Sequence, residues 1–323
     1  MDELLHKYRD LLSEENFNSS ITSNKVCLFL GAGVARNLGM PDWNGLASNI
    51  SNWCLENEIL KHSDVHILNK ISNPLKVISY CTQQIKAKKK ETIFNNYLKL
   101  IFIDDPKSKY EEEPSLYNNF IKLYKSGKVL LVQTNYDRTI ENNVTEVQPF
   151  IPYLDDNNIK LTNKLFVYLH GRFNENYNDI VLTKEKYNEV YVLENKPAQE
   201  KQRNFIRQLL KSYTVIMLGY SLQDNEIIQL IANRKETEEY KKVIVIIDTC
   251  KAKEISNKID AQYWKSCCNN NIEIYTYSTE NNGFKNFNKV VKDLTNKIIK
   301  KSEVSSITKY ADPQTIEDLN NEI

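Results

Sequence analysis

Short runs of apolar, mostly β-branched residues recur along the chain and alternate with stretches of helical periodicity. The clearest runs are Val26–Leu30, Lys128–Gln133, Leu165–Leu169, Thr214–Leu218, Val243–Ile247 and Ile272–Tyr277. Continuous apolar runs of this length are typical of strands that are buried on both faces. Amphipathic segments such as Glu200–Lys211 and Asn225–Lys235 lie between several of them. This alternation predicts an α/β fold with a doubly wound, parallel, Rossmann-like sheet.

Residues 43–127 interrupt the alternation, because they contain no convincing strand. Trp43, Leu46, Ile50 and Trp53 recur at spacings of three and four, which places them on one face of a helix. We expect further helices over 72–87, 91–103 and 114–125, and hence a helical insertion packed above the carboxyl edge of the sheet. The expected organisation is a helical N-terminal extension (1–24), a catalytic domain (25–300) that contains this insertion, and a polar C-terminal tail (301–323). Segment 141–164 is rich in Asn and Asp and is expected to be loop.

Composition and charge narrow the class of protein. A formal net charge of +1 argues against nucleic-acid binding as the main function. No apolar stretch is long enough to span a bilayer, and the N-terminus lacks the features of a signal peptide, so we expect a cytoplasmic protein without membrane association. The six cysteines include no CxxC pair, so we expect neither a four-cysteine zinc site nor, in a reducing compartment, disulfides.

Glycine is scarce, with eight residues in a chain of 323, well below the usual ~7%. Six of the eight lie in or beside four short segments: 31–43, 133–137, 169–171 and 218–224. Each segment begins at or just after the end of an expected strand, where open α/β sheets bind their ligands. The pattern predicts a nucleotide site assembled from the ends of several strands.

The first segment begins with Gly31-Ala32-Gly33 directly after a strand. Glycines in such a turn permit backbone N–H groups to approach a diphosphate, although a plain strand-to-helix turn is as good an interpretation. In the same segment, capping of the following helix is the favoured interpretation of Asp42. After the next strand, Asn135 and Asp137 supply an amide and a carboxylate, either to a ligand or to the turn itself.

The remaining segments offer a base and further polar groups. His170 ends an apolar strand, and imidazole is the side chain best suited to proton transfer near neutral pH. Gly219 allows close backbone approach, and Ser221 offers a hydroxyl to phosphate or to a helix cap. Asp248 ends a later strand, where it is placed either to accept from a ribose hydroxyl or to cap the next helix.

Four stretches in this order resemble the motifs of the sirtuin family, the silent-information-regulator NAD enzymes. They are GAGVARNLGMPDW (31–43), QTNYD (133–137), LHG (169–171) and GYSLQD (219–224). The likeness is closest to the bacterial sirtuin-like branch found in anti-phage systems and covers roughly residues 25–250. It implies that Asn135 orients the ribose and the attacking nucleophile, that Asp137 holds the nicotinamide amide, and that His170 is the general base. The dinucleotide contacts then come from Gly31, Ala32, Gly33, Asp42, Trp43, Thr134, Asp137, Gly219, Ser221 and Asp248.

The chain also departs from that family. Ala35 stands where the branch has a small hydroxyl residue, and the four-cysteine zinc module of protein-deacylating sirtuins is missing. The expected activity is therefore NAD glycohydrolysis, with NAD as substrate, water as acceptor and no zinc, which would deplete NAD during phage infection. The alternatives are an NAD-dependent deacylase or ADP-ribosyltransferase, and a non-catalytic dinucleotide sensor. The resemblance further implies a homo-oligomer that is activated by a protein partner, such as an ATPase or nuclease-like protein, or by a phage-derived trigger.

Overall fold

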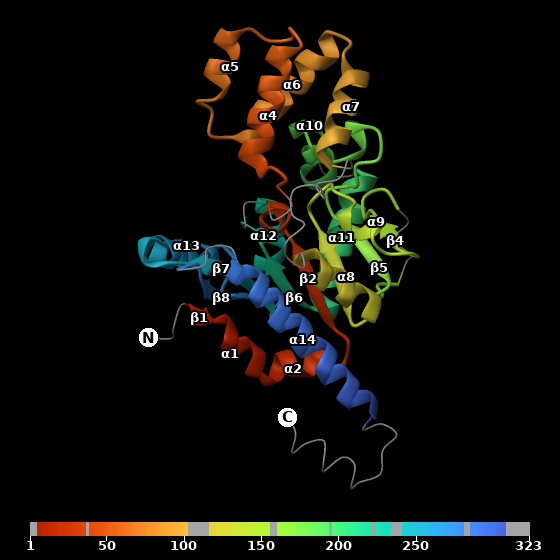
Figure 1. Cartoon of the computed structure of the whole chain (residues 1–323), viewed down its shortest axis with the longest axis vertical. Helices are drawn as coiled ribbons and strands as arrows, with labels where there is room; N and C mark the ends of the chain where they lie inside the picture. The colour runs from red at the N-terminus through yellow and green to blue at the C-terminus, as the bar shows by residue number, and fades with distance from the viewer. Residues whose placement is uncertain are drawn as a thin grey trace.

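Eight strands, all parallel, form the sheet at the centre of the fold (Figure 1). The computed structural model describes residues 5–36, 39–102, 116–155, 160–193, 196–220, 222, 224–233, 241–280 and 285–307. The strands are β1 (His6–Lys7), β2 (Val26–Leu30), β3 (Val129–Gln133), β4 (Gln148–Phe150), β5 (Leu165–Tyr168), β6 (Thr214–Leu218), β7 (Val243–Thr249) and β8 (Ile272–Ser278). Their order is β1-β8-β7-β6-β2-β3-β5-β4, which confirms the predicted parallel α/β fold.

Strand β2 occupies the position where the winding direction reverses. Its five residues are buried, and Val26 is in register with Val129 of β3 on one side and Thr214 of β6 on the other. The chain leaves β2 towards β3, β5 and β4, and later returns to β6 on the opposite side. Such a reversal opens a crevice at the carboxyl ends of the central strands, where ligands of doubly wound sheets bind.

Two edge strands were not expected from the sequence. Strand β1 lies inside the N-terminal extension predicted to be helical, and β4 lies inside the predicted loop 141–164. Each has at most three residues, and in β4 only Phe150 is buried. Edge strands this short carry no continuous apolar run, so sequence periodicity does not detect them.

Helices cover both faces of the sheet. One face carries α11 (Pro197–Ser212), α12 (Asn225–Ala232) and α13 (Glu254–Cys267), and the other carries α1 (Tyr8–Ser13), α2 (Glu15–Thr22), α8 (Leu116–Ser126) and α14 (Lys285–Ile307). Helix α14 lies beside α1 and α2 (Figure 1) and extends past residue 300 into the predicted tail, whose residues 308–323 are outside the described part of the chain. None of the described helices is long and apolar enough to cross a membrane.

A separate group of helices lies beyond the carboxyl edge of the sheet (Figure 1). It consists of α4 (Trp43–Glu56), α5 (His62–Leu68), α6 (Pro74–Ala87) and α7 (Glu91–Phe102), and residues 103–115 are outside the described ranges. These helices have their own core, which includes Trp53 and Phe94 and extends to Tyr136 and Phe173 in the loops after β3 and β5. The last helix expected in the insertion, α8, instead packs on the sheet, because its apolar side joins the sheet core.

Candidate active site

The loops after β2 and β6 are in direct backbone contact. Gly31 N donates to Leu218 O at 2.9 Å, and Gly33 N donates to Gly219 O at 2.8 Å. A Cβ atom on Gly31 would lie 2.4 Å from Gly219 O, and one on Gly33 would lie 2.8 Å from the Cα of Gly219. Gly219 itself has a φ of +61°, which disfavours other residues. The two loops therefore need glycine to pack against each other, and contact of these glycines with a dinucleotide stays a prediction.

The loop after β3 is hydrogen-bonded to the end of β2 and to the Gly31 turn. Thr134 N donates to Leu30 O at 3.0 Å, and the side-chain Nδ2 of Asn135 donates to Gly31 O at 3.1 Å. Asn135 is 8% exposed, and no described residue donates a hydrogen bond to its Oδ1. The structure thus brings Asn135 and the Gly31 turn together and leaves an amide oxygen able to orient water. Ala32, between the two glycines, begins the short helix α3 (Ala32–Ala35).

His170 is buried next to this junction. Its side chain follows β5, and the preceding Leu169 N donates to Gln133 O at 2.8 Å, which ties β5 to β3. His170 is 2% exposed, and its ring packs edge-on against the ring of Tyr191, with centroids 5.7 Å apart. Within the described ranges, neither ring nitrogen has a hydrogen-bond partner. A buried histidine with two unpartnered nitrogens at a ligand-binding edge is suited to proton transfer.

Asp224 lies beside His170 and was not assigned a site role from the sequence. Its Oδ2 lies 3.9 Å from Nε2 of His170 and accepts a hydrogen bond from the hydroxyl of Tyr220. Asp224 precedes α12 at the cap position, yet its carboxylate accepts no capping hydrogen bond. The only sequence signal was its place at the end of GYSLQD. Ser221, in the same stretch, is outside the described residues.

Burial and Asp224 act in opposite directions on the pKa of His170. Burial disfavours the imidazolium ion and lowers the pKa, whereas the Asp224 carboxylate raises it, and burial is the larger effect. The pKa therefore lies below its ordinary value of 6.5. The lowered pKa favours the neutral imidazole, which is the form that can accept a proton.

Asp137 is also buried, but it contacts its own loop. Its Oδ1 accepts from Thr139 N at 3.0 Å, and its carbonyl accepts from Gln133 Nε2 at 2.9 Å. The other carboxylate oxygen is buried and has no hydrogen-bond partner among the described residues. Burial raises the pKa of Asp137, while the hydrogen bond from Thr139 opposes that rise. The carboxylate stabilises the turn, and its contact with nicotinamide stays a prediction.

Asp42 and Trp43 lie at the start of α4. Asp42 Oδ1 accepts from Gly45 N at 2.9 Å, as expected of a helix cap. Trp43 packs edge-on against Tyr136, with ring centroids 6.3 Å apart. The Tyr136 hydroxyl in turn donates to Val181 O at 2.7 Å, so this ring connects α4, the loop after β3 and the segment after His170.

Asp248 and Arg172 are each paired with a side chain of opposite charge. Asp248, at the end of β7, accepts from Lys253 Nζ at 2.6 Å, and its expected ribose contact stays a prediction. Arg172 donates through Nε to Oε2 of Glu141 at 2.6 Å, so its charge is paired. No group of three His, Cys, Asp or Glu side chains that could hold a metal ion occurs in the described part of the chain.

Residues 129–272 match the family model described as the SIR2-like domain. This match supports membership of the sirtuin-like family. The matched region runs from the start of β3 to the start of β8 and contains Asn135, His170 and Asp224, whereas the Gly31 turn precedes it. A SIR2-like domain indicates a function related to NAD. No protein of curated function matches the chain.

Proposed function

We propose that this protein is an NAD glycohydrolase, which cleaves NAD to nicotinamide and ADP-ribose. The observation that carries the proposal is the state of His170, which is buried and without a hydrogen-bond partner among the described residues. It belongs to the edge of the sheet that also holds the Asn135 amide and the contact between Gly31 and Gly219.

The reaction breaks the bond between nicotinamide and C1′ of the ribose. Nicotinamide leaves as a neutral molecule, and the ribose passes through an oxocarbenium-like state that water attacks at C1′. Asn135 Oδ1 accepts a hydrogen bond from this water, and an imidazole nitrogen of His170 takes its proton. The carboxylate of Asp224, 3.9 Å from Nε2, then stabilises the imidazolium ion electrostatically. The products are nicotinamide, ADP-ribose and one proton.

The surroundings of His170 support water as the acceptor. The segment after His170 folds back over it, since Val181 N donates to the His170 carbonyl at 2.7 Å and Tyr191 packs against the ring. With 2% of the residue exposed, this enclosure favours a small acceptor over an acylated peptide. The same enclosure supports a second part of the proposal, that activity rises when a partner protein or a phage-derived trigger shifts this segment.

The reaction class is tested by incubating the purified protein with NAD and separating the products by chromatography, with and without an acetyl-lysine peptide. We expect nicotinamide and ADP-ribose in equal amounts in both samples. Cleavage that requires the peptide, with transfer of the acetyl group to ADP-ribose, would instead establish a deacylase. NAD that binds but stays intact would establish a sensor.

We also propose that NAD depletion by a homo-oligomer of this chain protects a bacterial population against phage. The support is the likeness of the motifs around Asn135 and Gly219 to the defence-associated branch. The test is cellular NAD after phage infection of a host that expresses either the wild-type protein or His170→Ala. We expect NAD to fall only with the wild type, and equal NAD in both cultures would refute a defence role.

A further inference from the structure

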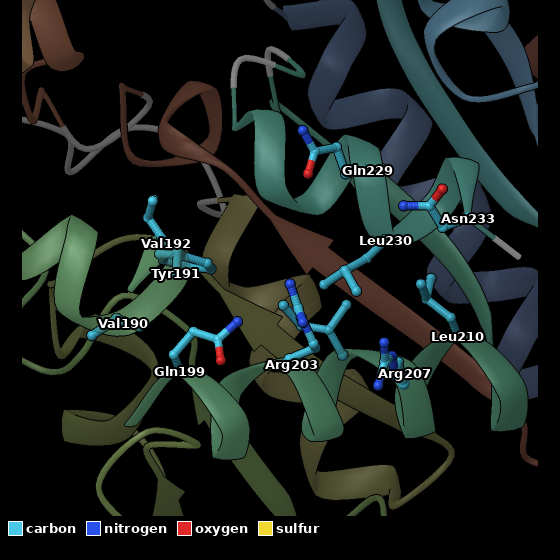
Figure 2. Close-up of a pocket in the computed structure, with 11 residues that line it drawn as sticks. Val190, Tyr191, Val192, Gln199, Arg203, Arg207, Leu210, Gln229, Leu230 and Asn233 are labelled. Atoms are coloured by element: carbon cyan, nitrogen blue, oxygen red, sulfur yellow. The ribbon is translucent and has the colours of Figure 1, made fainter. Parts of the chain in front are cut away.

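A pocket of about 430 Å³ lies between helices α11 and α12 and the π-helical turn Asn188–Val192 (Figure 2). Its size falls within the range of roughly 300–1,000 Å³ typical of small-molecule sites. None of the residues predicted to bind NAD lines it. The pocket is nevertheless close to His170, because Tyr191 forms part of its wall and contacts the His170 ring.

The floor of the pocket carries two positive charges. Arg203 and Arg207 are four residues apart on α11 and therefore lie on the same face of the helix (Figure 2). Both are exposed, and neither forms an ion pair with any residue that the structure describes. No acidic residue is among the described residues that line the pocket. Two adjacent guanidinium groups with no counter-charge among the described residues favour a ligand that carries phosphate, which arginine binds through paired hydrogen bonds.

The rest of the pocket wall is uncharged and combines amide, aromatic and aliphatic side chains. Gln199, Gln229 and Asn233 add side-chain amides, each of which both donates and accepts hydrogen bonds. Tyr191 and Leu230 add aromatic and aliphatic surface. An inorganic anion would bind the arginines but would not contact the side-chain amides or the apolar surface. A nucleoside phosphate matches all of them, because its base presents hydrogen-bonding edges and an apolar face.

We propose that this pocket binds a nucleoside phosphate, with the phosphate on Arg203 and Arg207 and the base among the amides and Tyr191. This ligand is distinct from the NAD that is cleaved. The inference does not depend on the proposed activity, because it rests on residues outside the predicted NAD site.

The first test is protection of individual arginines from phenylglyoxal, read by peptide mass spectrometry. Arg9 on α1 is the matched control, because it is exposed and belongs to the opposite face of the sheet. We expect ADP to slow modification of Arg203 and Arg207 at least fivefold and to leave Arg9 unchanged. Equal modification with and without ADP would overturn the proposal. Equal protection by ADP and inorganic diphosphate would overturn the nucleoside part.

The second test uses calorimetric titration of ADP into the Arg203→Gln/Arg207→Gln and Arg9→Gln variants. Both substitutions on α11 alter exposed side chains, and thermal melting confirms that the variants are folded. Loss of one ADP site per chain in the double variant alone is the expected result. An unchanged number of sites and an unchanged affinity would overturn the assignment, whether or not the protein cleaves NAD.

Discussion

The Nε2 atom of His170 lies 3.9 Å from Oδ2 of Asp224, although these residues follow strands β5 and β6, which are separated in the sheet by β2 and β3. At a strand spacing of about 4.8 Å, β5 and β6 are some 14 Å apart. Tyr220 spans part of this distance, because its ring packs edge-on against Phe29 of β2, the strand next to β6, with ring centroids 5.0 Å apart. Tyr220 also donates to Asp224 and so fixes the carboxylate beside His170.

This pairing predicts the pH dependence of NAD cleavage. His170 acts as a base only when neutral, so activity is present above its pKa and is lost as the pH falls through it. Because burial lowers that pKa, the acid limb of kcat/KM against pH is expected below pH 6.5. An acid limb above pH 6.5 would show that His170 is not the titrating base.

Asp224→Asn removes the charge that opposes the effect of burial. The pKa of His170 is expected to fall further, so the acid limb moves to lower pH while the maximal rate decreases, because the imidazolium ion is less stabilised. Asp260→Asn, at an exposed position on α13, is the matched control and leaves the profile unchanged. A shift to higher pH in Asp224→Asn would contradict the proposed relationship.

The contact between the loops after β2 and β6 predicts that Gly219→Ala is more destabilising than Gly127→Ala. Both glycines have a similar positive φ, +61° and +64°, so alanine meets the same backbone cost of about 1–2 kcal/mol at either site. A Cβ atom at Gly219 would also lie 2.7 Å from Val34 N, whereas at Gly127 nothing lies within 4 Å. Urea unfolding measures the difference. Equal losses of unfolding free energy would show that the close approach is not a constraint.

Tyr136→Phe tests the link between the helical group and the segment over His170. The substitution removes the hydrogen bond to Val181 O and leaves that buried carbonyl without this donor, which is expected to cost about 1 kcal/mol. Hydrogen exchange at the Val181 and Leu182 amides should become faster. Tyr80→Phe, on a tyrosine 40% exposed, is the control and should change neither quantity. The same exchange rates in both variants would rule out a role for this hydrogen bond.

The sequence predicts the sheet better than the site. The central strands are buried on both faces and therefore appear as continuous apolar runs, as at β2 and β3. The short edge strand β4 carries no such signal. The partnership of His170 with Asp224 depends on the path of one loop across two strands, which no local pattern encodes.

The glycines illustrate the same limit. Their scarcity correctly marks Gly31 and Gly219 as constrained positions, but the sequence leaves open whether a ligand or the fold itself imposes the constraint, and the structure shows that the two loops approach each other closely. Likewise, Arg203 and Arg207 belong to the polar side of an ordinary amphipathic helix. They become a candidate site only through the position of α12.

The most direct test of the account is the rate of nicotinamide release from NAD by the wild type, Asn135→Ala and His170→Ala, with Asn52→Ala and His66→Ala as controls. Asn52 and His66 are exposed on α4 and α5, so the controls make the same chemical changes away from the site. We predict release by the wild type and both controls, and a loss of about 100-fold or more in Asn135→Ala and His170→Ala. Absence of release from the wild type, or equal rates in all five proteins, would contradict the account.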